Sequence, residues 1–236
     1  RAGSILIDPS GVSFNWNGSG NDQFTDGASY SVIASDFITL NDVYLSTRKV
    51  AAGDANRANI ASASSTGDSG NLLLQAPTIT VSGGSKLLAY ADSGKSGGDI
   101  SLDATRTAGG DAKISVDGSS TIKGKNVTLG ASSSYTNPSP NLLPIVIQTL
   151  RANIDINSSR VEAVGGNVAM NATTSVNAST PGFFPLGTID IHSDASVNVG
   201  GDSRIVTTGS GDARLKATST VTSKALPGTP DFVKLP

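Results

Sequence analysis

A six-residue pattern with an apolar residue at its second and fourth positions recurs through most of the chain. Each copy begins with Asn, Asp or Thr and ends with Ala or Ser. The copies are NLLLQA (71–76), DISLDA (99–104), NVTLGA (126–131), NIDINS (153–158), TIDIHS (188–193) and DARLKA (212–217). Successive side chains of a β-strand point to opposite faces, so this alternation predicts a strand with one buried face. Its recurrence without intervening helical segments predicts a repeat architecture.

We expect the copies to stack as an all-β parallel β-helix, a solenoid with rungs of about 21–28 residues. Two columns of apolar side chains should fill its interior. The second-position column is Leu72, Ile100, Val127, Ile154, Ile189 and Ala213, and the fourth-position column is Leu74, Leu102, Leu129, Ile156, Ile191 and Leu215. One rung cannot bury its own apolar face, so stability should come from neighbouring rungs.

The regularity of the pattern divides the chain into three segments. These are irregular N-terminal β-rungs or a cap (1–70), regular rungs (71–225) and an extended C-terminal tail or linker (226–236). Residues 1–16 are expected to form a hairpin-like pair of strands around a turn with the sequence Asp-Pro-Ser-Gly.

Two proline-rich segments, 134–146 and 179–187, interrupt the regular rungs. Proline cannot donate a hydrogen bond to a central ladder, so both should protrude as side loops. They carry Tyr135, Phe183 and Phe184. Exposed aromatic loops favour a site for a glycan or another partner, whereas loops that fold back would cover the coil.

The composition excludes several functional classes. The net charge of −2 leaves no broad basic field for nucleic acid. The absence of Cys excludes thiol catalysis, and a single His, His192, excludes a multi-His metal site. No stretch approaches the length of apolar residues that a membrane span needs, so we expect no membrane insertion. The chain lacks an initiator Met and a signal peptide, and we expect it to be a fragment of a longer precursor.

Three segments resemble the filamentous haemagglutinin-like adhesins, the large bacterial exoproteins of two-partner secretion. They are AGSILIDPSGVSF (2–14), SDFITLNDVYLST (35–47) and the repeat at 71–104, in which Gly-Asp precedes a strand and Gly-Gly marks a corner. The resemblance extends over most of the chain. It implies a right-handed β-helix, an extracellular or bacterial cell-surface location, and a role in cell adhesion or biofilm assembly. No catalytic residue and no cofactor come with it.

The outward positions of the later copies are charged. If the copies stack in one register, Asp155, Asp190, His192, Arg214 and Lys216 should share one external face. Lyases and epimerases built on β-helices use such acids and bases to bind uronates and move a proton. The alternative is a solvated face whose opposite charges pair weakly.

The segment GSGNDQFTDG (18–27) resembles one turn of a calcium-binding nonapeptide repeat. Such sites need two successive turns to complete the oxygen cage, and no second copy follows. We therefore expect a loop, with Asp22 and Asp26 as the ligands if calcium binds.

Three functions are consistent with these patterns. The first is a non-enzymatic segment of an extracellular bacterial adhesin, a stiff spacer beside further repeats of a longer parent protein, which binds matrix polysaccharide or a host glycan. The second is a polysaccharide lyase or epimerase that acts on acidic polysaccharide. The third is a calcium-dependent structural module.

Overall fold

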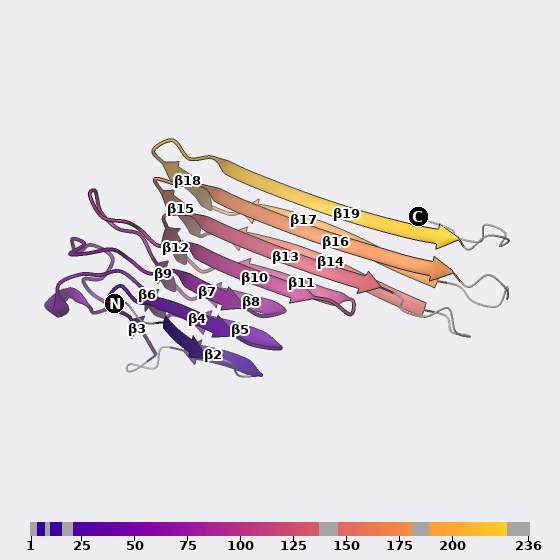
Figure 1. Ribbon diagram of the computed structural model, residues 1–236, viewed down its shortest axis with the longest axis horizontal. Helices are drawn as coiled ribbons and strands as arrows, with labels where there is room; N and C mark the ends of the chain where they lie inside the picture. Colours follow the sequence, from indigo (N-terminus) through magenta and orange to yellow (C-terminus); the bar gives the residue numbers. More distant parts are fainter. Residues whose placement is uncertain (1–3, 8–9, 16–20, 137–145, 181–188, 226–236) are drawn as a thin grey trace.

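The computed structural model describes residues 4–7, 10–15, 21–136, 146–180 and 189–225. Within these ranges the chain forms nineteen β-strands and one short 3-10 helix, η1 (Ala52–Asp54). The strands form three parallel sheets (Figure 1).

Sheet A, in spatial order, contains β1 (Ser4–Ile7), β4 (Ser29–Ile33), β7 (Leu72–Gln75), β10 (Ile100–Arg106), β13 (Val127–Thr136), β16 (Val168–Thr180) and β19 (Ala213–Ala225). Sheet B contains β2 (Gly11–Asn15), β5 (Phe37–Asn41), β8 (Thr78–Ser82), β11 (Gly110–Val116), β14 (Val146–Asn157) and β17 (Ile189–Gly200). Sheet C contains β3 (Gln23–Phe24), β6 (Tyr44–Ser46), β9 (Lys86–Leu88), β12 (Thr121–Gly124), β15 (Arg160–Val164) and β18 (Arg204–Thr208).

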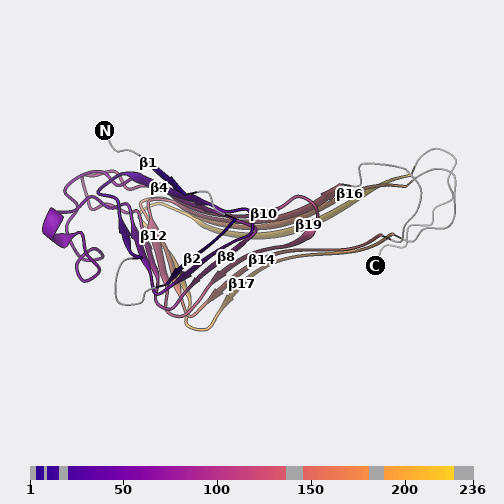
Figure 2. The ribbon, with the colours of Figure 1, turned by 90° about the horizontal axis from the view of Figure 1, so that it is seen from below.

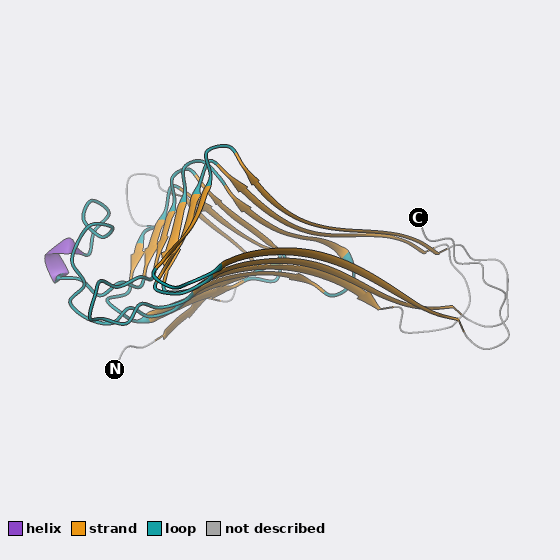
Figure 3. Cartoon of the chain, turned by 90° about the horizontal axis from the view of Figure 1, so that it is seen from above, coloured by secondary structure: helices purple, strands orange, loops and turns teal. Residues whose placement is uncertain are grey.

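The chain visits sheets A, B and C in turn and winds as a right-handed parallel β-helix (Figures 1 and 3). The predicted fold class is confirmed. The right-handed path is the one expected for parallel strands joined by crossovers. Among the described residues, no helix is long and apolar enough to cross a membrane.

The rungs are unequal in length. At the start of several sheet A strands, a backbone N–H donates a hydrogen bond to a side chain one rung below. The donor and acceptor residues are 28 apart at Asp99 and 27 apart at Asn126, which agrees with the predicted rung length. The corresponding separations are 41 residues at Asn167 and 45 at Asp212. The later rungs are longer because β13, β14, β16, β17 and β19 have 10 to 13 residues. Their distal parts form a two-layered blade of sheets A and B beyond sheet C (Figures 2 and 3).

The register corrects the predicted interior columns. The copies at 71, 99, 126 and 212 lie in sheet A, but those at 153 and 188 lie in sheet B, on β14 and β17. The missing rung of sheet A is NVAMNA (167–172). The fourth-position column is therefore Leu74, Leu102, Leu129, Met170 and Leu215. Every strand of a solenoid has the same two-residue alternation, so the alternation alone does not assign a strand to a sheet.

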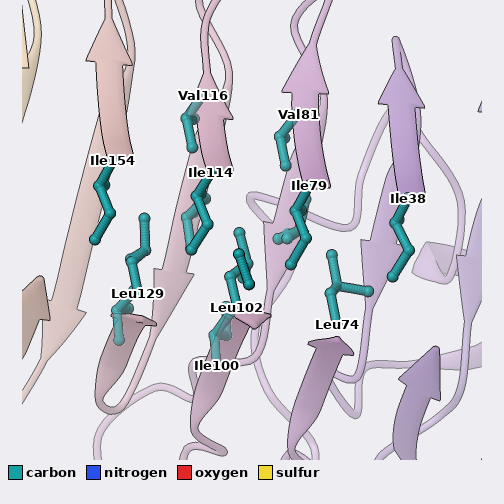
Figure 4. Close-up of a cluster of buried hydrophobic side chains, with 14 of the residues drawn as sticks. Ile38, Leu74, Ile79, Val81, Ile100, Leu102, Ile114, Val116, Leu129 and Ile154 are labelled. Carbon is teal, nitrogen blue, oxygen red and sulfur yellow. The ribbon is translucent and has the colours of Figure 1, made fainter. Parts of the chain in front are cut away.

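The core lies inside the triangular coil. Leu74, Leu102 and Leu129 of sheet A point toward Ile79, Ile114 and Ile154 of sheet B, and all are fully buried (Figure 4). Where sheets A and B converge, the inward column contains only alanine: Ala76, Ala104, Ala131, Ala172 and Ala217. At the next inward position of sheet A, the side chains are hydroxyl residues, Ser133, Thr174 and Ser219, and beyond them lies an apolar cluster around Leu150 and Val176. The Ser193 hydroxyl lies 2.7 Å from the Thr174 Oγ1 and 2.8 Å from the Ser219 Oγ.

The N-terminal strands join the same coil. β1 pairs in parallel with β4, and β2 pairs in parallel with β5, so the predicted hairpin-like pair does not form. A strand, a turn and a second strand have the same local sequence signals in a hairpin and at a solenoid corner. Only the partner strands from the next rung distinguish the two.

The Gly-Asn or Gly-Asp pair before several strands of sheet A has a structural role. The backbone N–H of Asp99 donates to the Asn71 Oδ1 at 2.9 Å, and the N–H of Asp212 donates to the Asn167 Oδ1 at 2.8 Å. A Cβ on the preceding Gly98 would collide with the Gly70 carbonyl oxygen. The side-chain ladder therefore requires close backbone approach, which only glycine permits.

Replacing Gly98 by alanine is expected to destabilise the chain by about 2–3 kcal/mol, because rigid backbone atoms must move to admit the methyl group. The matched control is Gly53→Ala, since a Cβ there meets nothing within 4 Å. Urea unfolding followed by circular dichroism measures both. Equal midpoints for the two variants would contradict the close approach of the rungs.

Candidate functional site: a hollow on the outer face of sheet A

A hollow of about 390 Å³ lies on the outer face of sheet A and crosses four strands, β7, β10, β13 and β16. Its lining is Gln75, Asp103, Thr105, Gly130, Ala131, Ser132, Asn171 and Thr173. We call it the sheet A hollow.

The hollow exists because two neighbouring outward columns have short side chains. Gly130 stands between Asp103 and Asn171 in the register and leaves a gap in its column. The next column contains only hydroxyl residues, Thr105, Ser132 and Thr173. Lys216 of β19 follows Asn171 in the register.

The lining can form many hydrogen bonds but has little charge. Asp103 is the only carboxylate among the lining residues, and its Oδ1 accepts a hydrogen bond from the Ser101 hydroxyl at 3.1 Å. Amides and hydroxyls both donate and accept hydrogen bonds. One carboxylate without a second acid or base is a poor arrangement for proton transfer. The chemistry therefore suits the binding of a hydroxyl-rich ligand.

The predicted charged patch is divided between two sheets. Asp155 lies on β14 in sheet B, where its Oδ1 accepts from Asn198 at 2.8 Å and its Oδ2 pairs with Lys113 Nζ at 3.6 Å. Asp190 and His192 lie further along the blade, opposite Ile147 and Thr149.

Arg214 and Lys216 lie in sheet A, opposite Ala169 and Asn171. Arg214 is highly exposed and pairs with Asp212 at 3.0 Å. The five residues are not brought together, because the copies at 153 and 188 belong to sheet B. Of the five, Lys216 alone is paired in the register with a lining residue of the sheet A hollow, Asn171.

The predicted aromatic site is only partly described. Tyr135 is half-buried and packs against Leu150, Val176 and Ile191, inside the blade. This packing accounts for Tyr135 as a structural residue. Phe183 and Phe184 lie outside the described residues.

The carboxylate of Asp22 has protein partners. Its Oδ1 accepts the backbone N–H of Tyr44 at 2.8 Å, and its Oδ2 pairs with Arg57 Nε at 3.2 Å. Asp26 occupies an exposed turn at φ 51°. No group of three or more Asp, Glu or His residues that could hold a metal occurs in the described ranges. These contacts give Asp22 a role in fastening the N-terminal rungs.

Sequence reasoning missed a buried arginine in the polar segment between β6 and β7. Arg48 is fully buried, and its guanidinium donates to the carbonyl oxygens of Tyr90 at 3.3 Å, of Ala63 at 2.8 Å and of Ile60. The same guanidinium lies 3.9 Å from the centroid of the Tyr90 ring. We call residues 47–70 the clasp, because Arg48 holds them against sheet C. An arginine in a polar stretch has no sequence signal that distinguishes it from a surface residue.

Asn171 was also missed, because its rung was not assigned to sheet A. Its signal was present, since NVAMNA follows the six-residue pattern.

No protein-family model, curated protein or solved structure matches this chain.

Proposed function

We propose that this chain is a non-enzymatic segment of an extracellular bacterial adhesin. It acts as a stiff spacer in cell adhesion or in a biofilm matrix, and it binds a matrix polysaccharide or host glycan. The observation that carries the binding role is the sheet A hollow, whose lining is polar, nearly uncharged and open to solvent.

The stiffness follows from how the rungs stack. Each sheet is a continuous parallel ladder, and the interior columns and the Asn and Asp side-chain ladder connect every regular rung to the next. In a solenoid, each repeat contacts its neighbours and bending requires that these ladders be strained. Such a stiff coil keeps its two ends at a fixed distance from one another, as a spacer must.

The last rung supports the proposal that further repeats adjoin this segment. Leu215 is 47% exposed and Val221 is 38% exposed, although their partners Met170 and Val176 one rung below are buried. All four point to the interior by register. A further parallel rung on β19 would bury these apolar side chains and pair the edge of β19 that has no partner among the described strands.

The surroundings of the hollow also favour a sugar ligand. Beyond it, the outer face of sheet A in the blade presents hydroxyls and one amide: Ser134, Thr136, Ser175, Asn177, Thr218, Thr220 and Thr222. Sugar hydroxyls exchange hydrogen bonds with such groups, and these groups offer a charged polymer no opposite charge. A neutral glycan is therefore the ligand that this face fits best.

Filling the hollow tests the proposal. A Cβ at Gly130 meets only the Asp103 Oδ1, at 3.4 Å, so Gly130→Gln should fold normally and occupy the space where a sugar would lie. We expect binding to neutral glycans on an array to fall about tenfold or more. The control Thr128→Gln adds the same side chain to an outward position of β13 that does not line the hollow. Equal glycan binding by both variants and the parent chain would refute the site, as would no binding by the parent.

A further inference from the structure

Basic side chains recur at the first outward position of sheet C. The register aligns Lys86, Thr121, Arg160 and Arg204 in one column on β9, β12, β15 and β18. In each rung this residue follows a corner serine, namely Ser85, Ser120, Ser159 and Ser203, which turns its hydroxyl back to a backbone carbonyl. The corners therefore place Arg160 and Arg204 side by side in consecutive rungs, on the same edge of the coil as Lys86.

A second hollow, of about 180 Å³, lies at this edge between sheets B and C. It is lined by Ser119, Ser120, Thr121, Ser158, Ser159, Arg160, Asp202 and Arg204. We call it the corner hollow. Its lining contains two guanidinium groups and one carboxylate, that of Asp202, so the net charge of the lining is positive.

The guanidinium of Arg160 is held in place from one side. Its Nε donates to the Glu162 Oε2 at 2.8 Å, and the Lys123 Nζ lies 3.3 Å from the Glu162 Oε1. Burial alone would raise the pKa of Glu162, but the hydrogen bond from Arg160 and the charge of Lys123 outweigh burial and lower that pKa below its ordinary value. Glu162 is therefore ionised at neutral pH and keeps Arg160 oriented. The terminal nitrogens of Arg160 have no protein acceptor among the described residues.

Arg204 is exposed, and no carboxylate in the described part of the chain pairs with it. Two guanidinium groups on adjacent strands repel one another unless an anion lies between them. Arginine also binds carboxylate and sulfate oxygens through paired, parallel N–H groups. Exposed Ser119 and Ser158 at the rim add hydroxyl donors for the rest of a sugar ring.

We propose that the corner hollow binds an oxyanion of an acidic polysaccharide, either the carboxylate of a uronic acid or a sulfate group, between Arg160 and Arg204. The polymer lies along the solenoid axis across β12, β15 and β18, because the corner hollow spans these rungs and Arg160 and Arg204 follow one another in that direction. This site lies on a different edge from the sheet A hollow, and it stands whether or not that hollow binds a neutral glycan.

Affinity electrophoresis of the whole chain tests the proposal, in gels that contain sodium polygalacturonate, dextran sulfate or neutral dextran. We expect an acidic polymer to retard the chain, and Arg204→Gln to weaken that binding about tenfold or more. Arg214→Gln is the matched control, since it removes the same charge from an exposed arginine in sheet A. We expect it to bind like the parent chain.

The different polymers distinguish a carboxylate ligand from a sulfate ligand, and the different variants distinguish the corner hollow from the sheet A hollow. Retardation by polygalacturonate identifies a carboxylate, and retardation by dextran sulfate alone identifies a sulfate. No retardation by either acidic polymer, or an equal loss in Arg204→Gln and Arg214→Gln, would overturn the proposal. Gly130→Gln should leave acidic binding unchanged, so failure of the sheet A hollow is distinguishable from failure of the corner hollow. Melting curves confirm that the exposed substitutions leave the fold intact.

Discussion

Replacing Leu129 by aspartate is expected to unfold the middle of the coil. Leu129 is fully buried, stacks between Leu102 and Met170 in sheet A, and points toward sheet B (Figure 4). An unpaired carboxylate in this interior loses its hydration and gains no partner, which costs several kcal/mol on top of about 2–5 kcal/mol for the lost leucine packing. A domain is stable by only about 5–15 kcal/mol in total, so the variant should be largely unfolded locally.

Circular dichroism and limited proteolysis measure this outcome. We expect Leu129→Asp to lose much of its strand signal and to be cleaved within the rungs around 100–172. Thr128→Asp is the control, because Thr128 is an exposed outward residue on the same strand. Its melting curve should follow that of the parent chain. If the two aspartate variants melt together, Leu129 does not line the interior.

Replacing Arg48 by alanine is expected to release the clasp and to destabilise the N-terminal half by about 3–5 kcal/mol. The substitution leaves the carbonyl oxygens of Ile60 and Ala63 without their guanidinium donor, and it opens a cavity beside the Tyr90 ring. The Tyr90 carbonyl loses one of its two donors and keeps the Ser69 hydroxyl. The apolar cluster between the clasp and the neighbouring rung, which includes Val50 of the clasp and Leu88 of β9, would also become exposed.

Two further variants separate the causes. Arg48→Met restores most of the volume but none of the hydrogen bonds, so it should recover only the packing part of the loss. Arg151→Ala removes an exposed arginine whose ion pair with Asp111 is 3.9 Å long, and an exposed pair contributes less than about 1 kcal/mol. Hydrogen exchange at 47–70 should accelerate in Arg48→Ala and, to a smaller extent, in Arg48→Met, but not in Arg151→Ala. Unchanged exchange there would show that the clasp is held by other contacts.

Much of the coil followed from the alternation of apolar residues. The alternation identified Leu74, Leu102 and Leu129 as one inward column, and the Gly-Asn and Gly-Asp pairs marked the start of sheet A strands. The outward position of Gln75, Asp103 and Gly130 was also predictable, since outward and inward residues alternate along a strand. Three members of the sheet A hollow could thus be found without coordinates.

The remaining site residues depended on register. Asn171 enters the sheet A hollow, and Asp155 leaves the predicted patch, because the long β13 and β14 strands shift the next rung by 41 residues rather than 27. Arg160 and Arg204 likewise become neighbours only through the pairing of β15 with β18. Sequence spacing does not measure distance across rungs when insertions lengthen individual turns.

The six-residue pattern by itself determined the class of fold, the inward face of each strand and the need for stacked rungs, because these depend on local alternation and on apolar burial. Only the tertiary structure decided which strands share a sheet, how the blade extends beyond sheet C, and where Arg48 is buried. Those features depend on hydrogen-bonded partners that are distant in sequence, so no local pattern contains them.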